Sequence, residues 1–233
     1  SQLLNEKIIR ISRKSKYIIF YLKKKILLCH LGMTGKILIL KKNINQMYKT
    51  SFYYDINIIP KHNHIYFVLD NKKILIYNDV RRFGFFKLKN KNQLKKIIFL
   101  NKLGLEPLST KFDPKYFKQY IYNKEKNIKN LLMDQRFLSG LGNIYVNEVL
   151  FISKVKPLRK CNDLTDIEIK NLVLNIKKIL KLSIAKGGSS IKDFKNTLGK
   201  SGNFQQFFQV YGKGGKNCSR ISCKGAIKKI SIS

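Results

Sequence analysis

The sequence predicts an α+β protein, because its first hundred residues have a β pattern and the rest has a helical one. Residues 1–100 contain short apolar runs rich in Ile, Tyr and Leu, separated by basic turns. After Pro107 the apolar residues recur at helical spacing. We divide the chain into a β domain (1–100), a helical domain (110–205) and a Gly- and Lys-rich end (206–233) that carries two cysteines.

The β domain is expected to be a sandwich or barrel, since its strands follow one another without intervening helices. Asp70-Asn71 suits a hairpin turn between the last two strands. The expected strands are Lys7–Ile11, Tyr17–Leu22, Ile26–Leu31, Lys36–Leu40, Phe52–Ile59, His64–Leu69 and Lys73–Tyr77.

The helical domain is expected to begin at Asp113-Pro114, where proline takes the first helical position. The longest helix should end at Gly187-Gly188. The expected helices are Pro114–Lys124, Ile128–Gln135, Asn143–Ser153 and Thr165–Lys186.

Leu131–Phe151 predicts a helix, a tight glycine turn and a second helix. Asn143 stands where the N-cap of the second helix is expected. Two glycines just before a helix start leave backbone N–H groups at the positive end of the helix dipole, which suits a phosphate. On this stretch alone, an ordinary helical hairpin is an equally good interpretation.

The charge of the chain indicates a polyanionic partner. Forty-eight Lys+Arg residues stand against 13 Asp+Glu, a net charge of +35, and nucleic acid is the usual partner of such a field. Nearly all of the excess is lysine within a generally Lys-, Ile- and Asn-rich composition, so the seven arginines carry more information. No apolar run approaches the length of a membrane span, and we expect no membrane partner.

Four cysteines, Cys29, Cys161, Cys218 and Cys223, do not form a disulfide framework, and a reducing cytoplasm is the expected compartment. Cys218 and Cys223 have C-x4-C spacing. Two ligands alone are weak evidence for zinc, which needs four in a structural site, and two free thiols are the simpler interpretation.

Two loops combine glycines with large side chains. His30–Gly35 (HLGMTG) is either a turn with a buried methionine or an exposed apolar wedge for a base stack. Asp79–Gly84 (DVRRFG) is either a charged hairpin rim or an arginine beside an aromatic wedge, with its neighbouring arginine on a phosphate. Lys16 by itself reads as a strand-edge lysine. Gly187–Phe194 reads as a helix cap and loop, or as a flap that closes on a ligand.

Taken together and in this order, eight motifs resemble the bacterial formamidopyrimidine-DNA glycosylase family, also called 8-oxoguanine DNA glycosylase/AP lyase. They extend from about residue 10 to the end of the chain. The motifs are RKSKY (13–17), HLGMTG (30–35), KHNH (61–64), NDVRRFGFF (78–86), LGLEPLS (103–109), LLMDQRFLSGLGNIYVNEVLF (131–151), GGSSIKDF (187–194) and GNFQQFFQVYGKGGKNC (202–218).

The resemblance implies an N-terminal β-sandwich, a helical domain with a helix–two-turn–helix motif and a zinc ribbon. It implies a monomeric base-excision repair enzyme of the bacterial cytosol or nucleoid. Such an enzyme binds double-stranded DNA, flips out oxidised purines such as 8-oxoguanine and formamidopyrimidines, removes them and nicks the abasic site by β,δ-elimination. Flipping is needed because the damaged base and the reacting sugar carbon are not reachable within the duplex.

The resemblance also implies residue roles. Lys16 matches the pocket lysine that transfers protons during elimination. Three residues match those that fill the void left by the flipped base: Met33, Arg81 and Phe83. Four match contacts to the DNA backbone: His64, Arg82, Lys129 and Asn143. Ser189 and Ser190 fall in the loop over the lesion, and Cys218 and Cys223 match the first half of a four-cysteine zinc site.

The chain departs from the family pattern at both ends. The family's nucleophile is an N-terminal proline followed by a glutamate, whereas this chain starts with Ser1-Gln2, and its second cysteine pair and ribbon arginine are missing. We therefore expect a chain truncated at both ends and without glycosylase activity of its own, and a borohydride-trapped adduct on 8-oxoguanine duplex would contradict this.

Three other interpretations stay open at this point. An endonuclease VIII-like enzyme would prefer oxidised pyrimidines, although GGSSIKDF and HLGMTG favour the purine enzyme. A non-catalytic remnant would recognise damaged duplex without cutting it. A general basic RNA-binding protein would show no preference for damaged duplex at equal salt.

Overall fold

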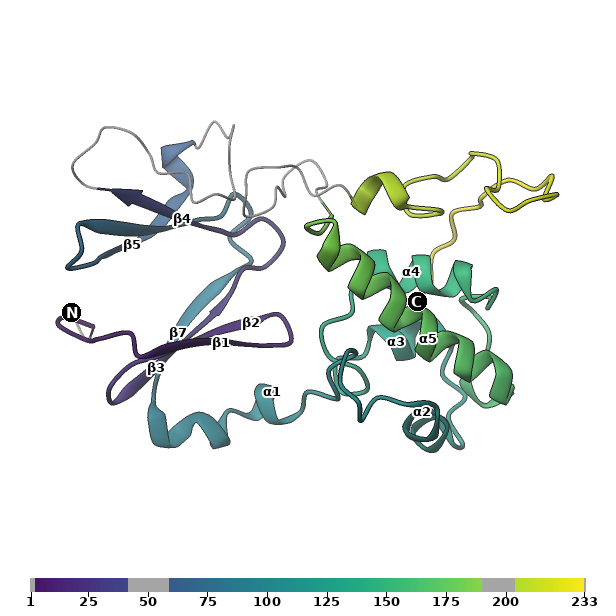
Figure 1. The fold of residues 1–233 in the computed structure, drawn as a ribbon, viewed down its shortest axis with the longest axis horizontal. Helices are drawn as coiled ribbons and strands as arrows, with labels where there is room; N and C mark the ends of the chain where they lie inside the picture. Colours follow the sequence, from purple (N-terminus) through teal and green to yellow (C-terminus); the bar gives the residue numbers. More distant parts are fainter. Residues whose placement is uncertain (1–2, 42–58, 190–203, 233) are drawn as a thin grey trace. The chain divides into compact units, whose positions relative to one another are not determined.

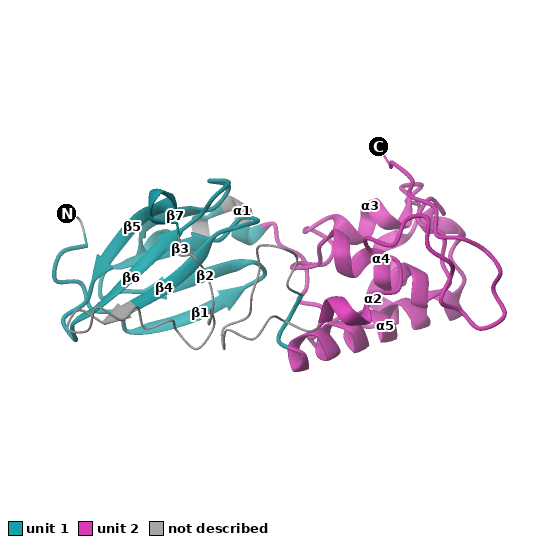
Figure 2. Ribbon diagram, turned by 90° about the horizontal axis from the view of Figure 1, so that it is seen from above, with its two compact units in different colours: residues 1–101, 187–203 teal, residues 102–186, 204–233 magenta. Residues whose placement is uncertain are grey.

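The chain folds into two compact units, seen in the computed structural model, which describes residues 3–41, 59–189 and 204–232 (Figure 2). The first unit comprises residues 1–101 and 187–203, and the second comprises 102–186 and 204–233. Every named strand lies in the first unit, and the four longer helices lie in the second (Figure 1). The expected α+β class, with strands first and helices after, is confirmed.

The strands form two antiparallel sheets. The four-stranded sheet has the order β1-β2-β3-β7, and the three-stranded sheet has the order β4-β6-β5. The strands are β1 (Arg10–Lys14), β2 (Tyr17–Tyr21), β3 (Lys25–His30), β4 (Lys36–Lys41), β5 (Asn63–Val68), β6 (Lys73–Asn78) and β7 (Phe85–Asn90).

Six of the expected strands occur within a few residues of their expected bounds, and the Asp70-Asn71 turn joins β5 to β6. The expected strand Phe52–Ile59 falls almost wholly outside the described residues. β1 starts three residues later than expected because its register is set by pairing with β2 across a tight turn. β7 is absent from the expected strands, although Phe86 and Leu88 alternate with Lys87 and Lys89, because this alternation covers only four residues.

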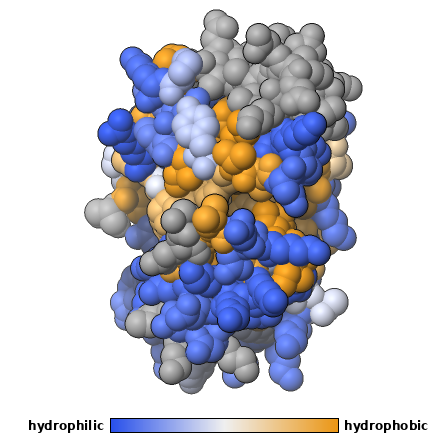
Figure 3. All heavy atoms as spheres, turned by 90° about the vertical axis from the view of Figure 1, so that its left-hand side faces the viewer, coloured by the Kyte–Doolittle hydropathy of each residue, from blue (hydrophilic) through white to orange (hydrophobic). Residues whose placement is uncertain are grey.

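Apolar residues from both sheets share one cluster, in which Phe20, Leu27 and Cys29 pack with Ile37 and Phe67. Beside this cluster lies a hollow of about 1220 Å³ lined by residues of both sheets. Figure 3 shows the side of the first unit that lies at the left of Figure 1. Apolar side chains gather there in a hollow, with hydrophilic residues above and below it. These sheets hold the loops that carry Met33 and Arg81.

The α-helices in the described part of the chain come after the strands: α1 (Ile98–Asn101), α2 (Pro114–Ile121), α3 (Ile128–Met133), α4 (Asn143–Ile152) and α5 (Asp166–Ala185). The short 3-10 helices are η1 (Pro60–His62), η2 (Lys91–Lys96), η3 (Cys161–Asp163) and η4 (Phe204–Phe207). The expected start at Asp113 is confirmed, because its side chain accepts the Tyr116 N–H at 2.7 Å. α5 starts with a capping box between Thr165 and Glu168.

The core of the second unit is aromatic and aliphatic. Phe112, Phe117 and Phe137 are fully buried, and Leu132 and Leu172 lie in the same cluster. The rings of Phe117 and Phe137 meet edge to face, with centroids 5.0 Å apart. This core fixes α3 and α4 against α5. No helix among the described residues is both long and apolar enough to span a bilayer.

Candidate nucleic-acid interface

The buried carboxylate of Asp79 joins the two loops that the sequence singled out. One oxygen accepts the Thr34 hydroxyl at 2.5 Å and the Arg81 N–H at 3.2 Å. The other accepts the Tyr77 hydroxyl at 2.8 Å and the Gly84 N–H at 2.9 Å. Asp79 therefore fixes the HLGMTG loop and the DVRRFG turn to each other.

Asp79 is fully buried, yet it keeps its charge. Burial by itself raises its pKa, but the hydrogen bonds from Thr34, Gly84, Tyr77 and Arg81 outweigh burial and hold the pKa below its usual value. A buried carboxylate with four donors is the arrangement in which a buried charge is tolerated.

Met33, Arg81 and Phe83 lie on these two joined loops. Met33 and Phe83 are each 57% exposed, and the Arg81 guanidinium lies over the Phe83 ring at 4.6 Å. The loops touch through glycines, because a Cβ at Gly32 would lie 2.6 Å from the Gly84 nitrogen. Large apolar side chains are thus presented to solvent on a rigid support.

His64 and Arg82 lie beside this support. The His64 Nε2 lies 2.8 Å from the Asp79 carbonyl oxygen, which can only accept, so Nε2 carries a proton and donates it. Arg82 has a φ of +56°, a left-handed conformation that is uncommon for a residue with a side chain. It occurs at the tip of the turn, between Arg81 and Phe83.

Lys16 lies in the turn between β1 and β2. Burial lowers the pKa of its ammonium group, which increases the share of neutral amine at a given pH. Lys16 also contributes to the lowered pKa of His30, at the end of β3, so the two side chains lie within electrostatic range.

The second unit carries the other two expected DNA contacts. Lys129 is the second residue of α3, and Asn143 is the first residue of α4. The expectation that Asn143 caps α4 is wrong. Gly142 is the N-cap, with extended backbone angles and no side-chain hydrogen bond, and the Asn143 side chain instead accepts from Asn147 at 3.1 Å. The start of α4 is therefore without a side-chain cap, as a phosphate-binding helix start requires.

Gln135 holds the turn between α3 and α4. Its amide nitrogen donates to the Leu141 carbonyl at 2.8 Å, and its amide oxygen accepts the Gly140 N–H at 2.8 Å. Gly140 has a φ of +93°, which a residue with a side chain rarely adopts. One side chain thus fixes the backbone that leads into α4.

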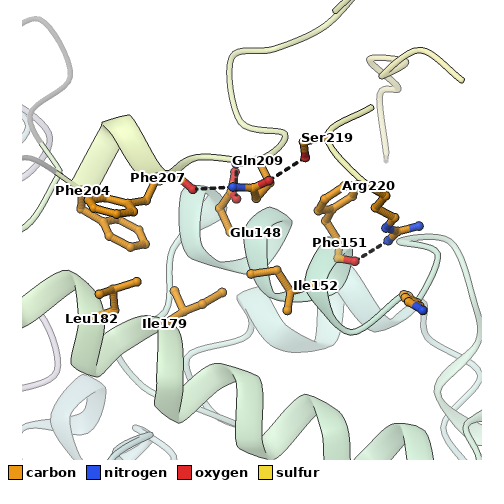
Figure 4. A pocket seen from close by; sticks show the side chains of 11 residues that line it. Glu148, Phe151, Ile152, Ile179, Leu182, Phe204, Phe207, Gln209, Ser219 and Arg220 are labelled. Atoms are coloured by element: carbon orange, nitrogen blue, oxygen red, sulfur yellow. Dashed lines mark hydrogen bonds between the residues drawn. The ribbon is translucent and has the colours of Figure 1, made fainter. Parts of the chain in front are cut away.

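Glu148, on the buried side of α4, binds the start of the C-terminal segment. Its carboxylate accepts the N–H groups of Gln209, Val210 and Tyr211 at 2.7, 3.0 and 2.8 Å. Next to it, α4, α5 and η4 enclose an apolar pocket of about 340 Å³ (Figure 4). Glu148 lines this pocket and anchors the C-terminal segment beside it.

Arg220 ties the cysteine pair to α4. Its guanidinium donates to the Phe151 carbonyl and lies 4.1 Å from the centre of the Phe151 ring (Figure 4). Cys218 and Cys223 flank it in a hairpin closed by the Cys218 N–H to Gly225 carbonyl bond at 2.8 Å. Hydrogen bonds from the Gly225 N–H and the Cys218 thiol, together with Arg220, lower the pKa of Cys223.

The two thiols fit part of a zinc site. A lowered thiol pKa favours the thiolate that zinc requires. The described ranges contain no group of three or more His, Cys, Asp or Glu side chains that could hold a metal ion. Two thiols are fewer than the four ligands that a structural zinc needs.

Ser189 follows the end of α5, beyond Gly187 and Gly188, which both have positive φ. Ser190 lies outside the described residues.

Sequence reasoning missed the residues that hold the site together: Asp79, Gln135 and Glu148. Each was read as part of a motif without a task of its own. The sequence did carry a signal for the two acids. In a chain with 48 basic and only 13 acidic residues, each acidic residue is unusual enough to suggest a specific role. Gln135 gave no comparable signal.

Two family models match the chain. The formamidopyrimidine-DNA glycosylase N-terminal domain matches residues 1–86, and the formamidopyrimidine-DNA glycosylase H2TH domain matches residues 103–195. Both matches agree with the motifs found in the sequence.

Curated relatives and solved structures point the same way. Formamidopyrimidine-DNA glycosylase of Streptococcus agalactiae (strain NEM316) is 41% identical over 92% of this chain and 74% of its own length. That of Rickettsia bellii (strain OSU 85-389) is 40% identical over 98% of this chain and 78% of its own. Lactococcus lactis Fpg in complex with DNA containing an abasic site has a TM-score of 0.83 at 35% identity, covering all of this chain and 80% of that one.

Asp79→Asn should destabilise the first unit by about 2–4 kcal/mol at neutral pH, because an amide cannot accept all four hydrogen bonds. The folded pKa of Asp79 is lowered, so its contribution is present above about pH 4 and is lost as the pH falls through the folded value. The difference between wild type and variant should shrink in acid, as measured by denaturant unfolding at several pH values.

The matched control is Asp70→Asn, which removes the same charge from an exposed turn. It should change the unfolding free energy by less than about 0.5 kcal/mol. An Asp79→Asn deficit that is the same at every pH would contradict the assignment of the carboxylate as the bonded species.

Proposed function

The chain belongs to the formamidopyrimidine-DNA glycosylase family, and we propose that it acts on double-stranded DNA containing oxidised purines or abasic sites. Members of this family are base-excision repair DNA glycosylases with AP lyase activity, which remove the damaged base and nick the strand by β,δ-elimination. A monomer in a reducing bacterial cytosol fits the four free cysteines and the relatives. One observation carries the proposal: Asp79 joins two loops, and these loops hold Met33, Arg81 and Phe83.

Met33, Arg81 and Phe83 fill the space that a flipped nucleotide leaves in the stack. Unstacking a base step costs roughly a few kcal/mol, and an apolar wedge on a rigid support offsets that cost without having to be ordered on binding. The cation–π contact between Arg81 and Phe83 keeps the guanidinium beside the ring.

Four residues contact the DNA backbone in this proposal. His64 and Arg82 act from the first unit, the arginine through its guanidinium. Lys129 and Asn143 act from the second unit, where the uncapped start of α4 adds backbone N–H groups for a phosphate. Ser189 and Ser190 contribute to the loop over the lesion.

Lys16 transfers protons during strand cleavage in this proposal. Burial lowers its pKa, so a larger share of the amine is neutral and able to accept a proton near neutral pH. Its place in the tight β1–β2 turn keeps the amine on a fixed support.

We also infer that the two sheets form the family's N-terminal β-sandwich and that residues 206–233 belong to its zinc ribbon. Cys218 and Cys223 would hold one structural zinc ion together with two further ligands. The zinc would fix the C-terminal hairpin, which Arg220 already ties to α4.

Met33→Ala should lower the preference for a duplex with an abasic site over an undamaged duplex by roughly tenfold, since the wedge matters only when the stack is open. Fluorescence anisotropy with both duplexes at one salt concentration measures the preference. Val68→Ala, which shortens another exposed apolar side chain, on β5, is the control and should leave the preference unchanged. Equal losses on both duplexes would refute the void-filling role.

Lys129→Ala should weaken binding to damaged and undamaged duplex about equally and reduce the slope of log affinity against log salt by about one phosphate contact. The exposed Lys170→Ala variant on α5 removes the same charge outside the proposed contact and should change the slope less. A loss confined to damaged duplex would show that Lys129 reads the lesion instead of the backbone.

Cys223→Ser and Cys218→Ser should each remove the thiolate-to-metal absorption that appears when cobalt replaces zinc, because a hydroxyl does not replace the thiolate. Cys161→Ser, which changes a buried thiol in η3, is the control and should keep the band. The metal assignment fails if the band is absent from the unsubstituted chain or survives in both variants.

A further inference from the structure

His30 stands at the base of the loop that carries Met33, and its ring is held from two neighbouring strands. It is the last residue of β3. Its ring centroid lies 5.0 Å from that of Tyr17 on β2 and 5.8 Å from that of Phe85 on β7, nearly parallel to the second at 13°. The imidazole therefore has a fixed place and orientation.

The ring makes one directional bond to the loop. Its Nδ1 accepts the backbone N–H of Gly32 at 3.0 Å. An imidazole nitrogen accepts a hydrogen bond only when it carries no proton, so this bond requires an uncharged ring with its proton on Nε2.

Gly32 is the residue at which the loop turns. Its φ is +64°, and the Gly84 nitrogen and the Phe83 backbone close the space around it. Met33 follows directly. The bond from Gly32 to His30 thus fixes the start of the turn, and the contact with Phe83 passes that constraint to the rest of the support.

The groups that face His30 favour its uncharged form. Burial, and then the cation of Lys16, lower the pKa of His30. Burial raises the pKa of Tyr17 on β2, so its hydroxyl is neutral near pH 7. On the β7 side Phe85 carries no charge. The Asp79 carboxylate accepts a hydrogen bond from the Gly84 N–H.

We propose that His30 is a positioning residue for lesion recognition: its uncharged imidazole holds Gly32, and through it Met33, in place beside Arg81 and Phe83. Protonation of Nδ1 breaks that bond and releases the turn. The proposal rests on the proposed function, because Met33 matters to recognition only if it enters the duplex.

The proposal separates two effects of acid on binding. General attraction to DNA increases as histidines gain charge. The preference for a damaged duplex instead decreases as the pH falls through the pKa of His30, which lies below its usual value near 6.5. A purely structural histidine would not make these two quantities move in opposite directions.

The test compares wild type, His30→Asn and His30→Phe on a duplex with a tetrahydrofuran abasic site and on the same duplex undamaged, between about pH 5 and 8 at constant salt. His30→Phe keeps the aromatic contacts and loses the acceptor, so the preference should fall roughly fivefold at neutral pH. The asparagine amide oxygen can replace Nδ1, so His30→Asn should keep the preference but lose its pH dependence. His62→Asn is the control and should behave as wild type.

A preference that is unchanged in His30→Phe, or that still depends on pH in His30→Asn, overturns the proposal. A wild type without any preference for the abasic duplex overturns the proposed function as well, which is a distinct result. If His30→Phe does not fold, nitrogen NMR of the three imidazoles gives a second readout, with His30 assigned from the His30→Asn spectrum. An Nδ1-protonated ring at neutral pH would contradict the proposal.

Discussion

The first unit depends on a single buried carboxylate. Asp79 accepts four hydrogen bonds, from Thr34 on one loop, from Arg81 and Gly84 on a turn more than forty residues away in the chain, and from Tyr77 on β6. Removing a carboxylate from water is costly unless donors replace the water, and here two hydroxyls and two backbone N–H groups do so. The same bonds that make the charge tolerable also fix where Met33 and Arg81 lie.

The second unit uses the same principle with different groups. Gln135 satisfies a donor and an acceptor of the turn before α4, and Glu148 satisfies three successive N–H groups of the C-terminal segment. In each case one polar side chain binds backbone that belongs to no helix or strand. Irregular segments thereby become as well defined as the elements that flank them.

The net charge of the protein has a different effect from these anchoring side chains. A net charge of +35 attracts any polyanion and gives affinity that depends on salt but little on sequence or damage. Discrimination must come from the few side chains whose positions are fixed, such as Met33 and Phe83, since a wedge must already be in place when the base leaves the stack. The histidine beneath the Met33 loop belongs with these few.

Local patterns determined much of the protein. Apolar periodicity, Asp113-Pro114 and the glycine pair after α5 predicted the α+β class and nearly every helix start and end, because helix capping and period act over a few residues. The ordered motifs determined the family, and with it the candidate residues. They did not reveal the strand β7, which is short and pairs with β3 from more than fifty residues away in the chain.

Only the tertiary structure decided how the candidates are held. Asp79 reads as part of a charged rim until burial and four donors identify it as an anchor, and Asn143 reads as a cap until the backbone angles assign that place to Gly142. His30 reads as a loop residue until its ring is found to accept from Gly32. Such roles depend on which groups meet across the fold and on whether water is excluded from them. The spacing of residues along the chain predicts neither the contacts nor the burial.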